Sequence, residues 1–300
     1  MDGGLGIEGR LDLRDLRRFS HEAMATVYEV YAPHADERYV AQAAQAAFDL
    51  VDRLELELSR FLPNSDIARI NHLRPGETTR VTPTTLECLT IARHLFDLTG
   101  GAFDVSIGTG LATLVLDQDA LAVGATVSDV RVDLGGIGKG YAVDLMAELL
   151  ADWGIGRALV HGGFSSVLAL EPPAGHDGWP LTLSDPHKPS RVLARLSARQ
   201  TALGASGLKK GDHIVDPRTG QQVRDRIAAW VGVPRPRTST EAPDGSRMAA
   251  AAVADALTTA FMLLATDEIA ALCARSPGLE GWVLTNADRP ALLHFGGPAR

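Results

Sequence analysis

The chain has 300 residues, of which 45% are hydrophobic and 22% are charged, and its formal net charge at pH 7 is −8. This composition is that of an ordinary globular protein and excludes a largely disordered chain, while the length suits one large domain or two fused ones. Nucleic-acid-binding proteins usually carry a basic face. The net negative charge and the lack of a Lys and Arg cluster therefore argue against a nucleic-acid-binding protein.

The first half of the chain alternates polar connections with periodic apolar segments. Residues 1–20 are polar and are expected to form a flexible lead before a single domain over residues 21–300. They show neither a secretory signal nor a lipobox, so a cytoplasmic protein is expected. The elements predicted next are a strand at 26–31, helices at 38–59 and 84–98 with a short capped turn through 67–70 between them, and a helix opening at residue 140.

The second half predicts mainly strands. They are expected at 157–161, 166–170, 192–196, 227–233, 281–284 and 291–295. Residues 234–246 are the most loop-like stretch, and a short helix is predicted at 267–274. Residues 248–265 hold one charge, Asp255, which disfavours membrane insertion, so we expect a buried helix and no membrane span. Strands and helices interleave without a regular βαβ rhythm, which indicates an α+β fold, a mixed sheet with helices.

The segment at 132–144, VDLGGIGKGYAVD, is rich in glycine where it leads into a helix. Glycines allow backbone amides to approach an anion closely, and a helix N-terminus adds positive potential. A dinucleotide fingerprint would need glycine at Tyr141, and a phosphate-binding P-loop would need Ser or Thr at Gly140, so neither standard motif fits. A phosphate-friendly loop and a turn chosen for tight packing both remain open.

The helix predicted at 248–265 holds Asp255 and Thr259 four residues apart, so both side chains share one face. Carboxylate and hydroxyl oxygens suit Mg²⁺, which also keeps waters and substrate phosphate. An Asp satisfied by its own helix and by neighbouring hydroxyls is the alternative.

A turn signature, Asp-Pro-Arg-Thr-Gly at 216–220, follows His213. This His is a candidate base or a contact to a bound ring, although a lone His is more often neither. The loop at 99–104 places Asp104 just beyond the end of a helix, which alone indicates only a capped loop.

Taken together and in this order, these segments resemble the ApbE-like family of FAD:protein FMN transferases over residues 24–285. The likeness consists of residues 24–26, 58–61, 64–71, 99–104, 133–144, 162–163, 206–207, 213–220 and 254–259. It implies a compact α+β fold with FAD in a cleft between two halves. It also implies Mg²⁺-dependent transfer of FMN from FAD to a Thr or Ser hydroxyl of an acceptor protein, with release of AMP.

Carried over by position, the resemblance also implies the site. The residues expected to contact FAD are Met24, Phe61, Ala102, Phe103, Asp104, Asp133, Lys139 and His213. Magnesium would be held by the Asp255 carboxylate, the Thr259 hydroxyl and the backbone carbonyl of Gly136, with Thr258 as a further candidate. His213 and Asp255 are the candidate bases for the proton of the acceptor hydroxyl.

The chain departs from the family pattern around the expected cleft. Ala25 stands where glycine is usual, Ala205 where threonine often stands, Phe164 where Asp is common, and Phe61 where tyrosine is more frequent. These changes leave FAD binding in place but keep two other functions open. One is a FAD pyrophosphatase-like hydrolase, in which water replaces the acceptor hydroxyl, and the other is a catalytically silent flavin-binding protein.

Overall fold

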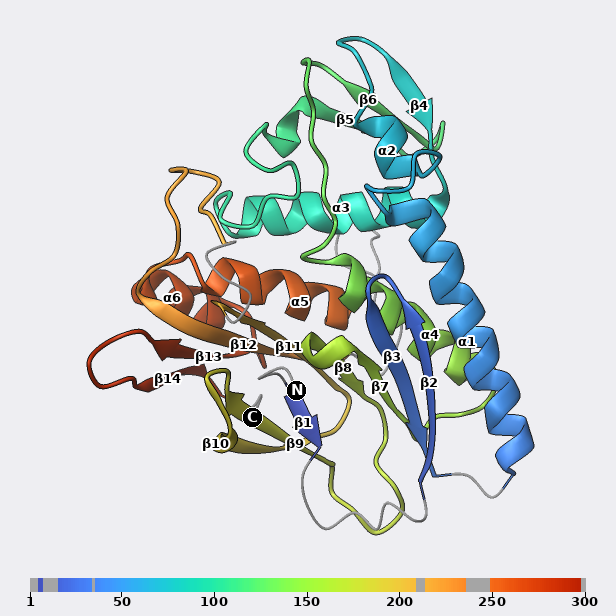
Figure 1. The fold of residues 1–300 in the computed structure, drawn as a ribbon, viewed down its shortest axis with the longest axis vertical. Coiled ribbons are helices and arrows are strands. Elements are labelled where there is room, and N and C mark those ends of the chain that lie inside the picture. Colours follow the sequence, from blue (N-terminus) through green and yellow to red (C-terminus); the bar gives the residue numbers. More distant parts are fainter. Residues whose placement is uncertain (1–4, 8–15, 34–35, 209–213, 236–248, 298–300) are drawn as a thin grey trace.

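An antiparallel sheet of eight strands forms the centre of the fold (Figure 1). The computed structural model describes residues 5–7, 16–33, 36–208, 214–235 and 249–297. The neighbour order of the sheet is β14-β13-β12-β11-β8-β7-β3-β2. Its strands are β2 (Arg17–Ala23), β3 (Thr26–Ala32), β7 (Leu159–Gly162), β8 (Ser166–Ala169), β11 (Thr201–Gly207), β12 (Arg226–Pro234), β13 (Glu280–Thr285) and β14 (Leu292–Gly296).

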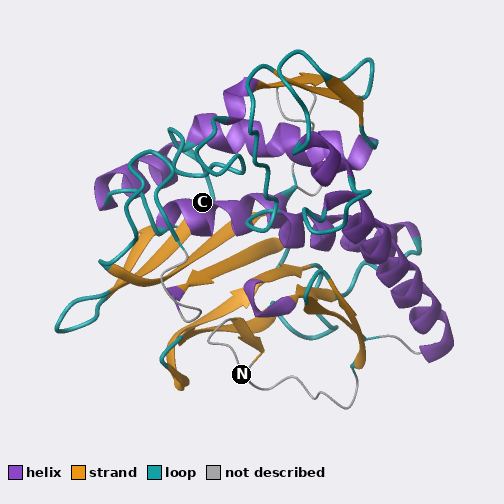
Figure 2. Ribbon diagram, turned by 45° about the horizontal axis from the view of Figure 1, so that its top comes forward, coloured by secondary structure: helices purple, strands orange, loops and turns teal. Residues whose placement is uncertain are grey.

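Helices cover one face of this sheet (Figure 2). Helix α4 (Gly138–Asp152) packs on β7 and β8, and α5 (Ala250–Phe261) packs on β11 and β12. Above them lie α1 (Glu37–Leu58) and α3 (Pro83–Leu98). Further helices are α2 (Asp66–Ile70), α6 (Thr266–Arg275) and the short 3-10 turns Leu111–Thr113 and Gly163–Ser165. A three-stranded sheet of β4 (Thr78–Arg80), β6 (Ala122–Ala125) and β5 (Leu114–Asp117) lies beyond α3.

The opposite face of the large sheet carries a second small sheet, β1 (Leu5–Ile7), β9 (Trp179–Asp185) and β10 (Lys188–Ala198). A separate apolar cluster fills the space there, and its largest members are Trp179, Trp230 and Trp282. The main core lies on the helical side and joins α1, α3, α4 and α5 to the sheet. Two apolar layers therefore hold one sheet from both faces.

Side-chain caps fix the starts of three helices. Asp36 accepts from the backbone amide of Tyr39 at α1, and Ser65 accepts from Ala68 at α2. Thr82 accepts from Thr85 at α3, where Pro83 occupies the first turn. Such caps satisfy amides that have no partner inside the helix.

A two-residue turn, Met24-Ala25, joins β2 to β3, because Ala23 and Thr26 are the last paired residues of that hairpin. Both turn residues have positive φ, 49° for Met24 and 56° for Ala25. Two left-handed residues are what a type I′ hairpin turn requires, and glycine adopts this conformation without steric cost. The alanine that replaces the usual glycine is therefore strained here.

The α+β class predicted from sequence is confirmed. Each predicted helix and strand has a counterpart, with ends shifted by up to a few residues, and the suspected membrane segment is the buried helix α5. No helix among the described residues has the length and apolarity that a membrane crossing needs. Strands β1, β2, β4, β5, β6, β9 and β11 were not predicted. Strand β2 begins at Arg17, inside the stretch expected to be a flexible lead.

Candidate active site

The glycine-rich segment forms a tight turn that leads into α4. The amides of Ile137 and Gly138 both donate to the carbonyl of Leu134, and α4 begins at Gly138. Asp133 closes the turn by accepting from the amide of Gly135 at 2.9 Å. The backbone of residues 133–138 is thus fixed at the N-terminus of a long helix, where positive potential favours an anion.

Asp255 on α5 faces this turn. Its Oδ2 accepts from the backbone amide of Gly140 at 3.1 Å and lies 3.4 Å from Nζ of Lys139. Burial raises the pKa of this carboxyl, because only 5% of the side chain is exposed, while Lys139 and the Gly140 amide act in the opposite direction. An acid held in this way, beside a glycine-rich helix start, suits a cation site.

The helices carrying these groups approach each other very closely. A Cβ on Gly140 would lie 2.1 Å from the carbonyl oxygen of Ala251, so no other residue fits there without movement of the backbone. The position therefore requires glycine for packing, which is one of the two readings left open for the glycine-rich segment. The same close contact is what brings Asp255 to the start of α4.

The two threonines after Asp255 differ in their surroundings. Thr258 is buried, and its hydroxyl donates to the carbonyl of Asp255 in its own helix at 2.6 Å. Thr259 is partly exposed and lies beside Gly136, where a Cβ would sit 3.7 Å from the Thr259 hydroxyl oxygen. The structure thus places Thr259, Gly136 and Asp255 around the same turn and gives Thr258 a partner within the helix.

Two buried residues near Asp255 were not singled out by the sequence. The Ser166 hydroxyl from β8 lies close enough to favour the ionised carboxylate, yet makes no hydrogen bond of normal geometry within the described residues. Tyr28 from β3 donates from its hydroxyl to Sδ of Met24 at 3.1 Å. Burial and the charge of Asp255 raise the pKa of Tyr28 well above its usual range. Neither residue stands in a recognisable motif, so no sequence signal marked them.

An open cavity of about 530 Å³ lies next to the segment that precedes Asp133. Its wall contains Arg60, Phe61, Asn71 and the segment 129–132. The Phe61 ring is 78% exposed, and the Arg60 guanidinium lies over it at 4.6 Å from the ring centre. Arg60 also pairs with Asp133, whose Oδ2 is 3.2 Å from Nε. An exposed aromatic ring fixed over a cavity is a suitable platform for a planar ring of a ligand.

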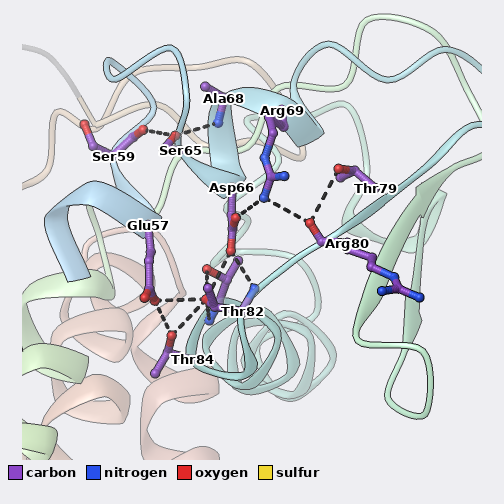
Figure 3. A network of polar contacts seen from close by, with 11 residues as sticks. Glu57, Ser59, Ser65, Asp66, Ala68, Arg69, Thr79, Arg80, Thr82 and Thr84 are labelled. Carbon is purple, nitrogen blue, oxygen red and sulfur yellow. Dashed lines mark hydrogen bonds and ion pairs between the residues drawn. The ribbon is translucent and has the colours of Figure 1, made fainter. Parts of the chain in front are cut away.

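Hydrogen bonds hold this wall in place. The side chain of Asn71 at the end of α2 bonds the backbone of Val132 in both directions, at 3.0 and 2.6 Å. At the start of α3, Thr82 accepts and donates within a polar network (Figure 3). The network joins Glu57 of α1, Asp66 and Arg69 of α2, and Thr82 and Thr84 at the start of α3. The loop carrying Phe61 is therefore anchored at both ends.

The loop after α3 approaches the same region. Ala102 and Phe103 are buried, and the Phe103 ring would lie 3.3 Å from a Cβ on Gly136. Asp104 accepts from the amide and hydroxyl of Ser106 and from the amide of Gly108, so its carboxylate shapes the loop. The structure places Phe103 against the glycine-rich turn and gives Asp104 a role within its own loop.

His213 lies outside the described residues. The turn after it, residues 216–220, packs against this loop, since a Cβ on Gly108 would lie 3.6 Å from the carbonyl oxygen of Pro217. Hydrogen bonding and charge from Arg218 lower the pKa of Asp216, and Arg218 binds it through two nitrogens. The turn at 216–220 is therefore held against the loop that contains Asp104 and Gly108.

The donors around Asp255 fit a hard divalent cation. They comprise a buried carboxylate, the hydroxyl of Thr259, the backbone of the 135–136 turn and the hydroxyl of Ser166. Within the described residues no three His, Cys, Asp or Glu side chains cluster, so a cation here would complete its shell with neutral oxygens, waters or substrate. Mg²⁺ is bound in this manner in sites that act on phosphates.

Comparisons with known proteins identify relatives of this chain. The sequence model described as "ApbE family" matches residues 24–283. The protein named FAD:protein FMN transferase from Klebsiella pneumoniae is 25% identical over 253 residues, 69% of this chain and 71% of that protein. Its namesake from Treponema pallidum is 26% identical over 295 residues, 80% of this chain and 76% of that protein.

Solved structures show the same fold. The flavin transferase ApbE from Vibrio cholerae aligns with a TM-score of 0.76 at 19% identity, over 93% of this chain and 97% of that one. The ApbE protein from Thermotoga maritima aligns with a TM-score of 0.78 at 21% identity, also over 93% and 97%.

Proposed function

The chain belongs to the ApbE family, and we propose that it transfers FMN from FAD to a Thr or Ser hydroxyl of an acceptor protein, in a Mg²⁺-dependent reaction that releases AMP. Its curated relatives bear the name FAD:protein FMN transferase, which gives the enzyme class. Magnesium, the acceptor hydroxyl and AMP are the finer parts of the proposal.

One observation carries these finer parts. A buried carboxylate, Asp255, faces a glycine-rich helix start through the Gly140 amide and the Lys139 ammonium. A binding protein would have no need for an acid that burial disfavours at this point. A cleavage site for a pyrophosphate needs both an anion-binding backbone and a carboxylate for a metal, and these two lie together here.

In the proposed complex, the aromatic ring of Phe61 supports a ring of FAD, and the turn at 133–138 faces the pyrophosphate. Asp133 keeps that turn closed and also fixes Arg60 against Phe61. Phe103 shields the turn from the side of α3. When bound at Asp255, Thr259 and the carbonyl of Gly136, Mg²⁺ would neutralise the charge that develops on the pyrophosphate.

The reaction balances as a phosphoryl transfer. The acceptor oxygen bonds to the phosphorus of the FMN half, the bond from that phosphorus to the bridging oxygen breaks, and AMP leaves with that oxygen. The hydroxyl proton goes to a base, for which His213 and Asp255 are the candidates. Replacement of His213 by Ala should slow single-turnover transfer at saturating FAD by about 10²-fold or more if His213 is the base. A change below about threefold would assign the proton to another group.

The test is incubation of the purified protein with FAD, Mg²⁺ and a peptide bearing a candidate acceptor threonine. A transferase adds the mass of FMN to the peptide and releases AMP in equal amount. A FAD pyrophosphatase-like hydrolase releases AMP and free FMN and leaves the peptide unchanged, and a silent flavin-binding protein releases neither. Asp255→Ala should abolish AMP release while the protein stays folded, and full activity of that variant would remove Asp255 from the metal site.

A further inference from the structure

Lys139 makes contacts that a metal ion would also make. Its ammonium nitrogen lies 3.4 Å from Oδ2 of Asp255 and donates to the carbonyl of Gly135 at 2.9 Å. A single cationic atom therefore bridges the buried carboxylate and the backbone of the glycine-rich turn. The carbonyl of Gly136, proposed above as a metal ligand, belongs to the next residue of the same turn.

Lys139 supplies the positive charge that the buried Asp255 carboxylate needs. The Asp255 side chain is 5% exposed, and within the part of the chain that the structure describes Lys139 is the only cation paired with it. A buried carboxylate without an opposite charge is strongly disfavoured. A cation must therefore remain beside Asp255 in every folded state in which this carboxyl is ionised.

The Lys139 side chain can also move away from Asp255. Its side chain is 24% exposed, against 5% for Asp255, so the flexible stem reaches toward solvent. The contact at 3.4 Å is longer than a close charge-assisted hydrogen bond, and the Ser166 hydroxyl beside it lacks a partner of normal geometry within the described residues. The Lys139 ammonium thus does not make close contacts with all the oxygen atoms around it. A divalent cation could bind these oxygen atoms more closely.

We propose that the Lys139 ammonium and a divalent cation occupy Asp255 in turn, and that the displaced ammonium then turns into the cleft toward the anionic substrate. Two cations at one carboxylate oxygen repel each other, so binding of the metal expels the lysine. This exchange rests on the proposed function for the identity of the substrate. It adds that Lys139 stabilises Asp255 until the metal binds and meets the pyrophosphate afterwards.

Lysine reactivity in the wild-type protein tests the exchange directly. An amine-reactive acetylating reagent is applied in EDTA and in saturating Mg²⁺, and the modification of each lysine is followed by peptide mass spectrometry. Modification of Lys139 should accelerate at least about threefold in Mg²⁺, because its amine leaves an ion pair. Lys188, an exposed residue at the start of β10, is the internal control and should react at one rate in both solutions. Equal rates for Lys139 with and without Mg²⁺ would overturn the proposal.

Variants give a second readout. Lys139→Met should melt about 5 °C or more below the wild type in EDTA, and Mg²⁺ should remove most of that difference. Its affinity for Mn²⁺ in calorimetry should rise about tenfold. Lys188→Met makes the same change in net charge on a distant sheet and should match the wild type in both measurements. If Lys139→Met melts like Lys188→Met in EDTA, the lysine is no partner of Asp255 and the proposal fails.

Asp255→Asn separates this exchange from the proposed reaction. Without the carboxylate, Lys139 should be acetylated rapidly with or without Mg²⁺, and a remaining Mg²⁺ effect would overturn the exchange. Transfer of FMN to a peptide is measured independently on the wild type. Absence of transfer together with Mg²⁺-dependent labelling of Lys139 would disprove the proposed function and leave the exchange intact.

Discussion

Asp144 on helix α4 caps the N-terminus of helix α5 from outside, because its carboxylate accepts from the backbone amide of Ala251 through both oxygens, at 3.0 and 2.9 Å. It also accepts from Ala252 at 2.9 Å. The residue that precedes α5, Ala249, has no side chain able to cap it. Asp144 belongs to the glycine-rich segment at 132–144, and Asp255 faces the turn in this segment. One segment therefore both caps α5 and lies opposite the carboxylate that α5 carries.

Replacement of Asp144 by Ala should lower the free energy of unfolding by about 1–3 kcal/mol, because two buried amides lose their acceptor. It should also weaken Mg²⁺ binding, since the first turn of α5 is no longer fixed against α4. Asp144→Asn keeps one acceptor oxygen and should recover part of both losses. Urea unfolding and calorimetric titration with Mg²⁺ measure the two effects.

Asp152 at the other end of α4 provides the control. It is exposed, and its replacement by Ala should change stability by less than about 0.5 kcal/mol and leave Mg²⁺ binding unchanged. If Asp144→Ala loses stability but binds Mg²⁺ as the wild type does, the cap serves the fold without positioning Asp255.

Ala25→Gly should stabilise the protein by about 1 kcal/mol. The native φ of 56° is left-handed, and glycine adopts it without the clash between Cβ and the backbone. Ala120→Gly is the matched control, because Ala120 is also an exposed turn residue but has no positive φ. That variant should be neutral or less stable. Chemical denaturation measures the free energy of unfolding of both variants. Equal changes in this free energy would show that Ala25→Gly does not release backbone strain.

Much of the fold could be predicted because its helices are amphipathic and capped. Helix α1 repeats apolar residues at three- and four-residue steps, and Ser65 and Thr82 stand at helix starts as capping residues should. Strand β11 shows why some strands could not be predicted. It contains Gly204, where a Cβ would lie 2.5 Å from the carbonyl oxygen of Ala254, so its small residues serve the close approach of α5. Small residues carry no strand signal.

The residues of the candidate site also fall into two groups, those that the sequence indicated and those that only the structure revealed. The segments holding Asp133, Lys139 and Asp255 stood out in the sequence because glycine and a lone buried acid are unusual in those settings. Ser166, Tyr28 and Asp144 act through tertiary contacts with residues far away in the chain, and no local pattern announces such contacts. Asp104 is the opposite case, a residue singled out from the sequence whose carboxylate accepts hydrogen bonds from Ser106 and Gly108 within its own loop.

Phe61→Ala should weaken FAD binding by about tenfold, because the exposed ring is the aromatic platform of the cavity and stacking contributes about 1–3 kcal/mol. Arg60→Ala should cause a smaller loss, since the ring remains but its cationic support and the pair with Asp133 are gone. Leu56→Ala, an exposed apolar residue on α1, is the control and should bind FAD normally. Titration followed by flavin fluorescence measures all three, and unchanged affinity for Phe61→Ala would place FAD elsewhere.

The last prediction concerns pH and stability. Only 4% of His161 on β7 is exposed, and burial lowers its pKa to about 4, although the charge of Glu29 on the neighbouring strand acts in the opposite direction. The unfolded chain protonates this His near pH 6.5, so it binds more protons than the folded state between pH 6.5 and 4. The free energy of unfolding should therefore fall as the pH drops through that window.

On going from pH 7.5 to pH 5.0, the wild type should lose about 2 kcal/mol more than His161→Gln, measured by urea unfolding at each pH. His176→Gln removes an exposed His and should keep the wild-type dependence. Parallel pH profiles for the wild type and His161→Gln would show that His161 is protonated as easily in the folded protein as in the unfolded chain.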